Sequence, residues 1–299
     1  MTPRTLLASF ADNARLKYLR RCVSGVCAPA RRGCPSCGDR RCHVIKRRKL
    51  ITALVRCAGC RLIYRVPLDP PGFGDEYYQG EYQCGFATDC PSPERLDQLL
   101  RMQFRGSSMD FTARLEMLRA LGVAPGSRIL DLGASWGYGT WQFAAAGYDA
   151  VGCEIGRDRA RYARERLHVR VESDIDRIGG DFDVFFSSHV LEHLPSPTIA
   201  FELAARTLKR GGLFLAFTPN GSMRCRDANP VEYHRYWGAI HPLYLDDSYY
   251  QSACAGRPTL LCSAPYDGRY DLETIARWNK QRDAILNLEA SELCAAVVF

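Results

Sequence analysis

A glycine-rich stretch and a distant carboxylate carry the main chemical signal of this 299-residue sequence. Residues 130–139 read Leu-Asp-Leu-Gly-Ala-Ser-Trp-Gly-Tyr-Gly, and Glu154 follows 21 residues after Gly133. Glycines at a strand-to-helix turn let the backbone approach a ligand, and the first N–H groups of the helix point at it. A carboxylate at the end of the next strand can accept hydrogen bonds from both hydroxyls of a ribose. We therefore expect a nucleoside-containing cofactor here.

The details of this stretch narrow the type of cofactor. The spacing lacks the complete G-x-G-x-x-G pattern, which disfavours the nicotinamide and flavin enzymes that share this turn. Asp131 stands just before the first glycine, where it can hold the ammonium group of a cofactor that contains an amino acid. The alternative for Gly137 and Gly139 is that they only permit close packing of helix on strand.

Two Cys-x-x-Cys pairs form the second chemical signal. Cys34 and Cys37 are separated by 19 residues from Cys57 and Cys60. Four thiolates at this spacing can surround one zinc ion tetrahedrally, and a closed four-ligand site leaves no position for water or substrate. We expect a structural zinc, with four unligated thiols as the alternative. The pair Cys42-His43 lies between the two Cys-x-x-Cys pairs and could replace one ligand, but we expect it in a loop outside the site.

The elements that must position these residues alternate between strand and helix. Strands are expected at 128–132, 150–155, 169–171, 182–186, 213–217, 259–262 and 293–299. Helices are expected at 109–121, 138–146, 157–167, 196–208, 246–255 and 271–288. This alternation predicts an α/β fold: a Rossmann-like, doubly wound, seven-stranded sheet with helices on both faces, preceded by a small zinc-ribbon-like module. Ligands bind such sheets beyond the carboxyl ends of the strands.

From about residue 107 onward, the order of motifs resembles the class I S-adenosylmethionine-dependent methyltransferases. It is most similar to the small-molecule branch with a "VLEHL" segment after the fourth strand, here residues 190–194. The other segments that carry the resemblance are 130–139, 182–189, 208–212 and 217–220. The resemblance implies S-adenosylmethionine as the cofactor, bound by Asp131, Gly133, Gly137, Glu154, Asp174 and Ser188. Asp176 is close enough to replace Asp174, and Ser135 stands where the family often has its middle glycine.

The same resemblance points to catalytic and substrate-binding residues. His241, before Pro-Leu-Tyr-Leu, matches an active-site histidine of several relatives, although Ile240 stands where some have a glutamate. His189 is the second candidate for the base, and a loop-anchoring role is the alternative for His241. The residues expected to contact the acceptor are Tyr77, Tyr78, Trp237 and His234. For the two adjacent tyrosines the alternative is aromatic packing between domains.

Charge divides the chain unevenly. Residues 1–65 hold 16 Lys/Arg and two acids, a net charge of +14, whereas the rest holds 40 − 16 = 24 basic and 33 − 2 = 31 acidic residues. This favours an anionic partner for the first part, its docking onto the acidic remainder, or simply a solvated basic face. We divide the chain into a basic zinc-binding module (1–65), a linker or lid (66–106) and a methyltransferase domain (107–299).

These observations predict methyl transfer to an oxygen or carbon of a small-molecule acceptor, such as a natural product or sugar. An RNA methyltransferase that holds nucleic acid with the basic module, and a non-catalytic scaffold, are the alternatives. No apolar run is long enough for a membrane span or a signal-peptide core, so we expect a cytoplasmic protein without a membrane partner.

Overall fold

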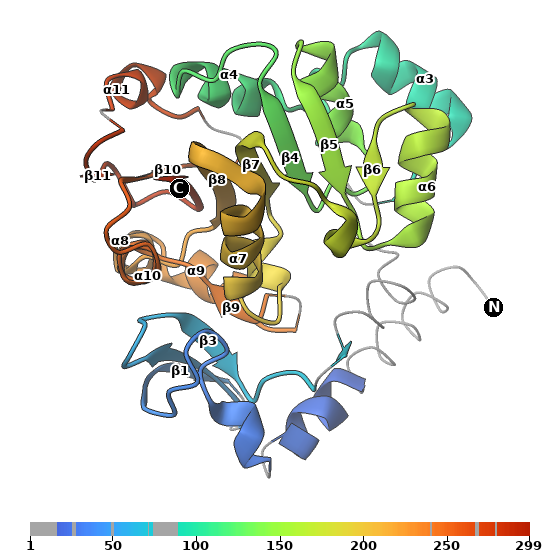
Figure 1. Cartoon of the computed structure of the whole chain (residues 1–299). Helices are drawn as coiled ribbons and strands as arrows, with labels where there is room; N and C mark the ends of the chain where they lie inside the picture. The colour runs from blue at the N-terminus through green and yellow to red at the C-terminus, as the bar shows by residue number, and fades with distance from the viewer. Residues whose placement is uncertain are drawn as a thin grey trace, which may run out of the picture.

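Two β-sheets organise the chain in a computed structural model that describes residues 17–25, 28–48, 51–70, 72–73, 89–239, 241–266, 269–278 and 280–299. The larger sheet has the strand order β11-β10-β12-β8-β7-β4-β5-β6 (Figure 1). Its strands are β4 (Arg128–Leu132), β5 (Asp149–Cys153), β6 (Val171–Glu172), β7 (Phe182–Ser188), β8 (Leu208–Pro219), β10 (Thr259–Ala264), β11 (Ala284–Ile285) and β12 (Glu292–Val298). Neighbours from β6 to β8 run parallel, whereas β12 is antiparallel to both β8 and β10.

Helices cover both faces of this sheet because its strands are apolar on both sides. Ile129 packs in a core on one face, and its neighbour Leu130 packs in a core on the other. The first face is covered by α4 (Thr112–Ala120), α5 (Tyr138–Ala145) and α11 (Leu272–Ala276), and the second by α7 (Thr198–Thr207) and α10 (Asp247–Ala253). Further α-helices are α3 (Pro93–Arg101), α6 (Arg157–Arg166), α8 (Met223–Ala228) and α9 (Pro230–Tyr236). The predicted doubly wound α/β fold is confirmed.

The predicted elements were wrong at two places. The helix expected at 271–288 ends at Ala276, and an eighth strand, β11, forms farther on. Next to β11, Leu286 N–H donates to Leu261 O. The edge of β10 offers backbone hydrogen-bond partners to this segment, and these outweigh its intrinsic preference for a helix. The strand expected at 213–217 begins earlier, at Leu208, so the Gly-Gly pair expected to end a helix lies inside β8.

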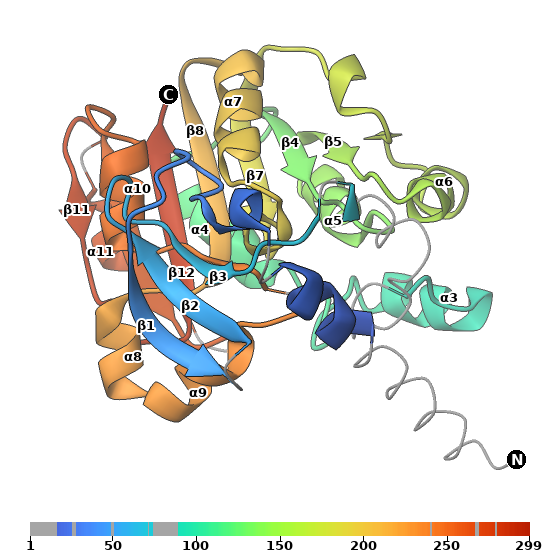
Figure 2. The ribbon, with the colours of Figure 1, turned by 90° about the horizontal axis from the view of Figure 1, so that it is seen from below.

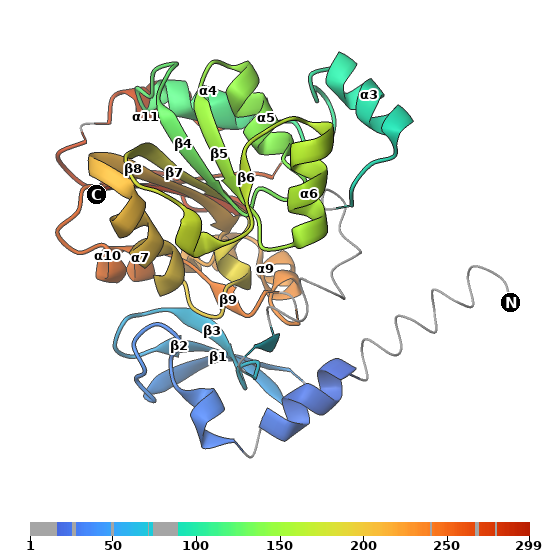
Figure 3. The same ribbon diagram turned by 45° about the vertical axis from the view of Figure 1, so that its right-hand side comes forward.

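The smaller sheet joins the N-terminal residues to the larger part of the chain. Its order is β1 (Cys42–Arg48), β2 (Thr52–Cys57), β3 (Ile63–Val66) and β9 (Leu243–Tyr244), all antiparallel. Figures 1 and 3 show the N-terminal strands against β9, and Figure 2 shows β1 and β2 beside α8 and α9. Residues 28–66, which we call the cysteine module, contribute β1 to β3 to this sheet. Its fourth strand, β9, comes from a segment that follows β8.

The predicted linker or lid, residues 66–106, contains the helix α3, whose Leu96 and Leu99 are buried against Trp136 and Leu167. Its residues 74–88, with Tyr77 and Tyr78, lie outside the described residues. In the described part of the chain, no helix has the length and apolar composition needed to cross a membrane. The proposed domain boundaries stay predictions.

Candidate active site

The turn between β4 and α5 has an unusual backbone. Gly133, Ser135 and Gly137 have φ angles of 75°, 51° and 88°, which only glycine adopts without cost. A Cβ atom on Gly133 would lie 2.3 Å from Val190 Cγ2, and one on Gly137 would lie 2.7 Å from Ala163 Cβ. Both glycines are thus required for packing as well as for the turn. The packing alternative considered for Gly137 is consistent with this contact.

Ser135, at the position where the resembling family often has glycine, makes the turn polar. Its hydroxyl is buried and has no hydrogen-bond partner among the described residues. Its backbone N–H donates to Glu154 Oε2 at 2.9 Å. A buried hydroxyl without a partner costs free energy, so a bound polar ligand that reached it would remove this penalty.

Glu154 ties the turn to the end of β5. Its Oε1 accepts from Gly156 N–H at 2.7 Å, while Oε2 accepts from Ser135 N–H. Burial raises the pKa of Glu154, and these two hydrogen bonds oppose the rise. Each carboxylate oxygen has two lone pairs, so both oxygens keep capacity for the hydroxyls of a ribose.

Asp131 lies deeper than Glu154. Thr140 Oγ1 donates to Asp131 Oδ2 at 2.7 Å, and burial raises the pKa of Asp131 to about 7. The ammonium group of a cofactor nearby would favour the ionised carboxylate.

A cavity of about 790 Å³ opens at the carboxyl ends of β4 to β7. Of the predicted cofactor residues it is lined by Gly133, Glu154 and Asp174, and also by the candidate base His189. Asp131, Gly137 and Ser188 are not among its lining residues. Asp174, not Asp176, faces it, which distinguishes the two candidates that the sequence left open. The volume of this cavity is suited to a small-molecule cofactor.

Three arginines line this cavity, which was not predicted from the sequence. Arg157, Arg159 and Arg177 line it beside Glu154 and Asp174. The first two open α6 directly after β5, and Arg159 lies 3.9 Å from Glu154 Oε1. Their position just after the acid predicted to bind ribose is a signal that could have been used.

His189 is held between two carboxylates. Its Nδ1 lies 3.3 Å from Glu192 Oε1, and its Nε2 lies 2.8 Å from Glu292 Oε1. Burial disfavours the charged ring, but these hydrogen bonds outweigh it and raise the pKa of His189 to about 9. Both ring nitrogens then donate, so neither is free to accept a proton at neutral pH. This geometry argues against the role of base considered for His189.

Glu292 belongs to a network that joins distant parts of the chain. Arg114 Nη1 donates to Glu292 Oε2 at 2.8 Å, and Tyr270 OH donates to the same oxygen at 2.8 Å. Burial would raise the pKa of Glu292, but Arg114 and the hydrogen bond from His189 outweigh it and lower the pKa to about 2. The sequence offered no signal for this network, since its members are far apart and share no motif.

His241 has a different environment. Its Nδ1 lies 2.9 Å from the carbonyl oxygen of Tyr236, so Nδ1–H donates and Nε2 is left as an acceptor. Its ring meets that of His193 at a centroid distance of 4.7 Å. Ligand-capable atoms of Glu192, His193 and His241 lie within 4.8 Å of one another, and Glu192 Oε2 is buried without a hydrogen bond. Such a set can relay a proton or hold a divalent cation.

Two of the residues predicted to contact the acceptor, Trp237 and His234, have packing roles in the structure. Trp237 is 1% exposed, lies under the guanidinium of Arg48, and donates from Nε1 to His234 Nδ1. Arg48 also donates to the backbone carbonyls of both residues. Neither side chain is among those lining the two cavities described here. Their contact with an acceptor stays a prediction.

A second cavity, of about 440 Å³, lies beyond the carboxyl end of β8. It is lined by Pro219, Asn220, Cys225, Asn229, Glu232, Tyr233, Tyr236, Tyr244, Pro265, Tyr266, Glu289, Ala290 and Ser291. Tyr266 lies 5.5 Å, between ring centroids, from His189, which lines the first cavity. The two cavities therefore adjoin at these rings.

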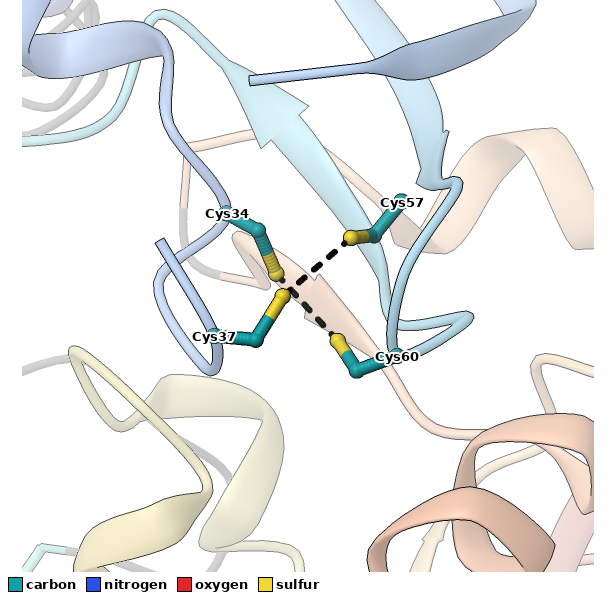
Figure 4. Close-up of side chains that lie close together, drawn as sticks. All are labelled: Cys34, Cys37, Cys57 and Cys60. Atoms are coloured by element: carbon teal, nitrogen blue, oxygen red, sulfur yellow. Dashed lines mark hydrogen bonds between the residues drawn. The ribbon is translucent and has the colours of Figure 1, made fainter. Parts of the chain in front are cut away.

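The paired cysteines come together as predicted. Cys34 Sγ lies 3.4 Å from Cys60 Sγ, and Cys37 Sγ lies 3.5 Å from Cys57 Sγ (Figure 4). Four sulfurs around one zinc at 2.3 Å would be about 3.8 Å apart, so small movements would complete the site. Cys42 is exposed and is not part of this cluster.

Comparisons with known proteins match the central part of the chain. Residues 130–216 match the family described as "Methyltransferase domain". The chain is 28% identical over 121 residues to the ubiquinone biosynthesis O-methyltransferase of Methylococcus capsulatus, covering 37% of this chain and 51% of the relative. It is 26% identical over 181 residues to the demethylmenaquinone methyltransferase of a Mycobacterium species, covering 60% and 72%. The chain thus spans about half the length of the first of these relatives.

Among solved structures, the chain is similar to the plantazolicin methyltransferase BpumL in complex with SAH. The TM-score is 0.47 and the identity 11%, over 75% of this chain and 93% of that one.

Proposed function

Because the chain contains a class I S-adenosylmethionine-dependent methyltransferase domain, we propose that the whole protein methylates an oxygen or carbon of a small-molecule acceptor. The observation that carries the proposal is the cavity at the ends of β4 to β7. It brings the turn at Gly133, the carboxylate of Glu154 and Asp174 to one site. Natural-product and sugar intermediates are the acceptor class we propose.

Each lining group has a role in this proposal. Glu154 would bind the ribose hydroxyls, and Asp174 would contact the adenine amino group. The buried hydroxyl of Ser135 gives the turn a polar group that lacks a partner, which fits a ligand bound there. Asp131, buried beneath the turn, would act on the ammonium end through its charge.

S-adenosylmethionine supplies the methyl group when it is bound, and the protein supplies orientation and proton removal. Holding two reactants in line contributes up to roughly 7–11 kcal/mol to catalysis. His241 would accept the acceptor's proton at Nε2, since its Nδ1–H is fixed by Tyr236 O. A positioned base typically adds about 10²–10⁴-fold in rate.

The zinc ion proposed for the four cysteines would have a structural role. Cys57 ends β2, and Cys60 lies just before β3, the strand that pairs with β9. The metal would therefore fix the turn between β2 and β3, and β3 is the strand that pairs with β9, shortly after His241.

The alternative of RNA methylation depends on the basic module. Part of its charge is used internally, since Arg56 pairs with Asp246 at 2.7 Å and Arg65 with Asp69 at 2.7 Å. Other basic residues, such as Arg40 and Arg47, are exposed and remain available to an anionic partner.

Transfer of a labelled methyl group from S-adenosylmethionine into small-molecule extracts tests the proposal. We expect a labelled small-molecule product, loss of activity in His241→Ala, and unchanged affinity of that variant for S-adenosylhomocysteine. RNA methylation would instead give labelled RNA and an RNA affinity that falls steeply with salt. A scaffold would bind no cofactor.

A further inference from the structure

Aromatic rings form much of the wall of the second cavity. Tyr233 and Tyr244 are buried, and their hydroxyls donate to the backbone carbonyls of Gly221 and Tyr233. These two hydroxyls are therefore used within the protein. Tyr236 and Tyr266, which also line the cavity, meet at a centroid distance of 5.6 Å. Tyr266 is 39% exposed, a large aromatic surface left open beside a cavity.

Carboxylates are the charged groups among the residues that line this cavity in the described part of the chain. Glu232 and Glu289 both line it, and neither Lys nor Arg is among these lining residues. Tyr236 OH donates to Glu232 Oε1 at 3.0 Å, which places this carboxylate beside an aromatic ring. The cavity thus combines aromatic rings with two carboxylates.

This combination has a specific chemical preference. The face of a tyrosine ring attracts a cation within about 6 Å of its centroid, and carboxylates add to that attraction. The same groups disfavour a phosphate or carboxylate in the same place. The positive charge of nearby His189 repels a cation in this cavity only weakly, because Glu192 and Glu292 both pair with that ring.

We propose that this cavity binds an ammonium group of the acceptor, so that the acceptor is an amine, an amino sugar or a quaternary ammonium compound. This inference rests on the proposed function, since it assigns the second cavity to the acceptor. The inference adds that the acceptor carries a positively charged group, and that this group lies at Tyr236, Tyr266 and Glu232.

The test is a calorimetric titration of the full chain saturated with S-adenosylhomocysteine. Choline is the cationic probe, and 3,3-dimethyl-1-butanol is its neutral isostere of the same shape. We expect choline to bind about 3- to 30-fold more tightly than the isostere, the range expected for cation–π pairs from exposed to desolvated sites. Glucose 1-phosphate, an anionic probe, should bind more weakly than choline.

Two variants locate the binding site. Glu232→Gln and Tyr266→Ala should each weaken choline binding by about 3-fold or more, whereas Glu202→Gln, an exposed carboxylate on α7, should not. Affinity for S-adenosylhomocysteine serves as the check that each variant is folded.

The results separate this inference from the proposed function. Equal affinity for choline and its isostere, tighter binding of the phosphate, or no choline binding up to about 50 mM with the cofactor site intact would overturn the ammonium site. Failure to bind S-adenosylhomocysteine at all would overturn the proposed function itself.

Discussion

Arg56 on β2 and Asp246, the N-cap residue of α10, form an ion pair of 2.7 Å in which both side chains are buried. This pair connects the cysteine module to the segment that carries His241. Burial raises the pKa of Asp246 to about 6, and Arg56 opposes the rise. The module is therefore bound to the segment that follows β8 by charge as well as by the pairing of β3 with β9.

Removing one member of this pair should destabilise the protein strongly. Arg56→Met leaves a buried carboxylate without its cation, and we expect the free energy of unfolding to fall by about 3–5 kcal/mol in urea titrations. The double variant Arg56→Met/Asp246→Asn should recover a large part of the loss. Arg41→Met, which breaks the solvent-exposed pair with Asp39, is the control and should leave stability almost unchanged. Equal effects of Arg56→Met and Arg41→Met would contradict the docking role.

Metal analysis should find one zinc ion per chain. Cys57→Ser should lose the metal and lower Tm by about 5 °C or more, because the turn between β2 and β3 loses its cross-link. The matched control is Cys42→Ser, which changes an exposed thiol on the same hairpin and should keep the zinc. Loss of metal in Cys42→Ser would show that the ligand set differs from the four clustered cysteines.

The stability contributed by His189 should depend on pH. Its folded pKa of about 9 lies above the ordinary value of 6.5, so its contribution is complete below pH 6.5 and is lost as pH rises through 9. The difference in unfolding free energy between the wild type and His189→Gln should shrink over this window. Its side chain is 35% exposed, so we expect a change on the order of 1 kcal/mol. A difference that stays constant from pH 6 to about 9.5 would contradict the two-carboxylate arrangement.

Gly133 should tolerate an added methyl group less well than Gly126, although both glycines have a positive φ angle. Gly133→Ala strains the backbone and places Cβ 2.3 Å from Val190 Cγ2, whereas Gly126→Ala, with a φ of 87°, meets nothing within 4 Å. We expect Gly126→Ala to cost about 1–2 kcal/mol and Gly133→Ala about 1–3 kcal/mol more in urea unfolding. Val190→Ala in the Gly133→Ala background should restore part of the difference. Equal costs at the two glycines would mean that Val190 can move away freely.

The sequence predicted what depends on local pattern. Alternating apolar strands and helices indicated the doubly wound sheet, and the spacing of Cys34, Cys37, Cys57 and Cys60 indicated their cluster. The turn at Gly133 and its acid Glu154 were also found, because both are set by one strand-to-helix unit.

What the sequence could not predict depends on long-range contacts. Glu292 comes to His189 only because β12 pairs with β8, and β9 reaches the cysteine module only through the fold of the chain after Asn220. The tyrosines of the second cavity come from separate segments, so no spacing rule connects Tyr236 with Tyr266. Trp237 was expected near the acceptor because its segment follows the fifth strand, and that contact stays a prediction. Its burial under Arg48 follows from the docking of the module.

Calorimetric titration with S-adenosylhomocysteine, in wild type and Glu154→Ala, tests the central claim most directly. The wild type should bind one molecule per chain with micromolar affinity, at low and high salt alike. Glu154→Ala should bind about 10-fold more weakly or worse, because the ribose loses a charged hydrogen-bond partner. No heat of binding in the wild type, or equal affinity in the two proteins, would contradict a cofactor site at the ends of β4 and β5.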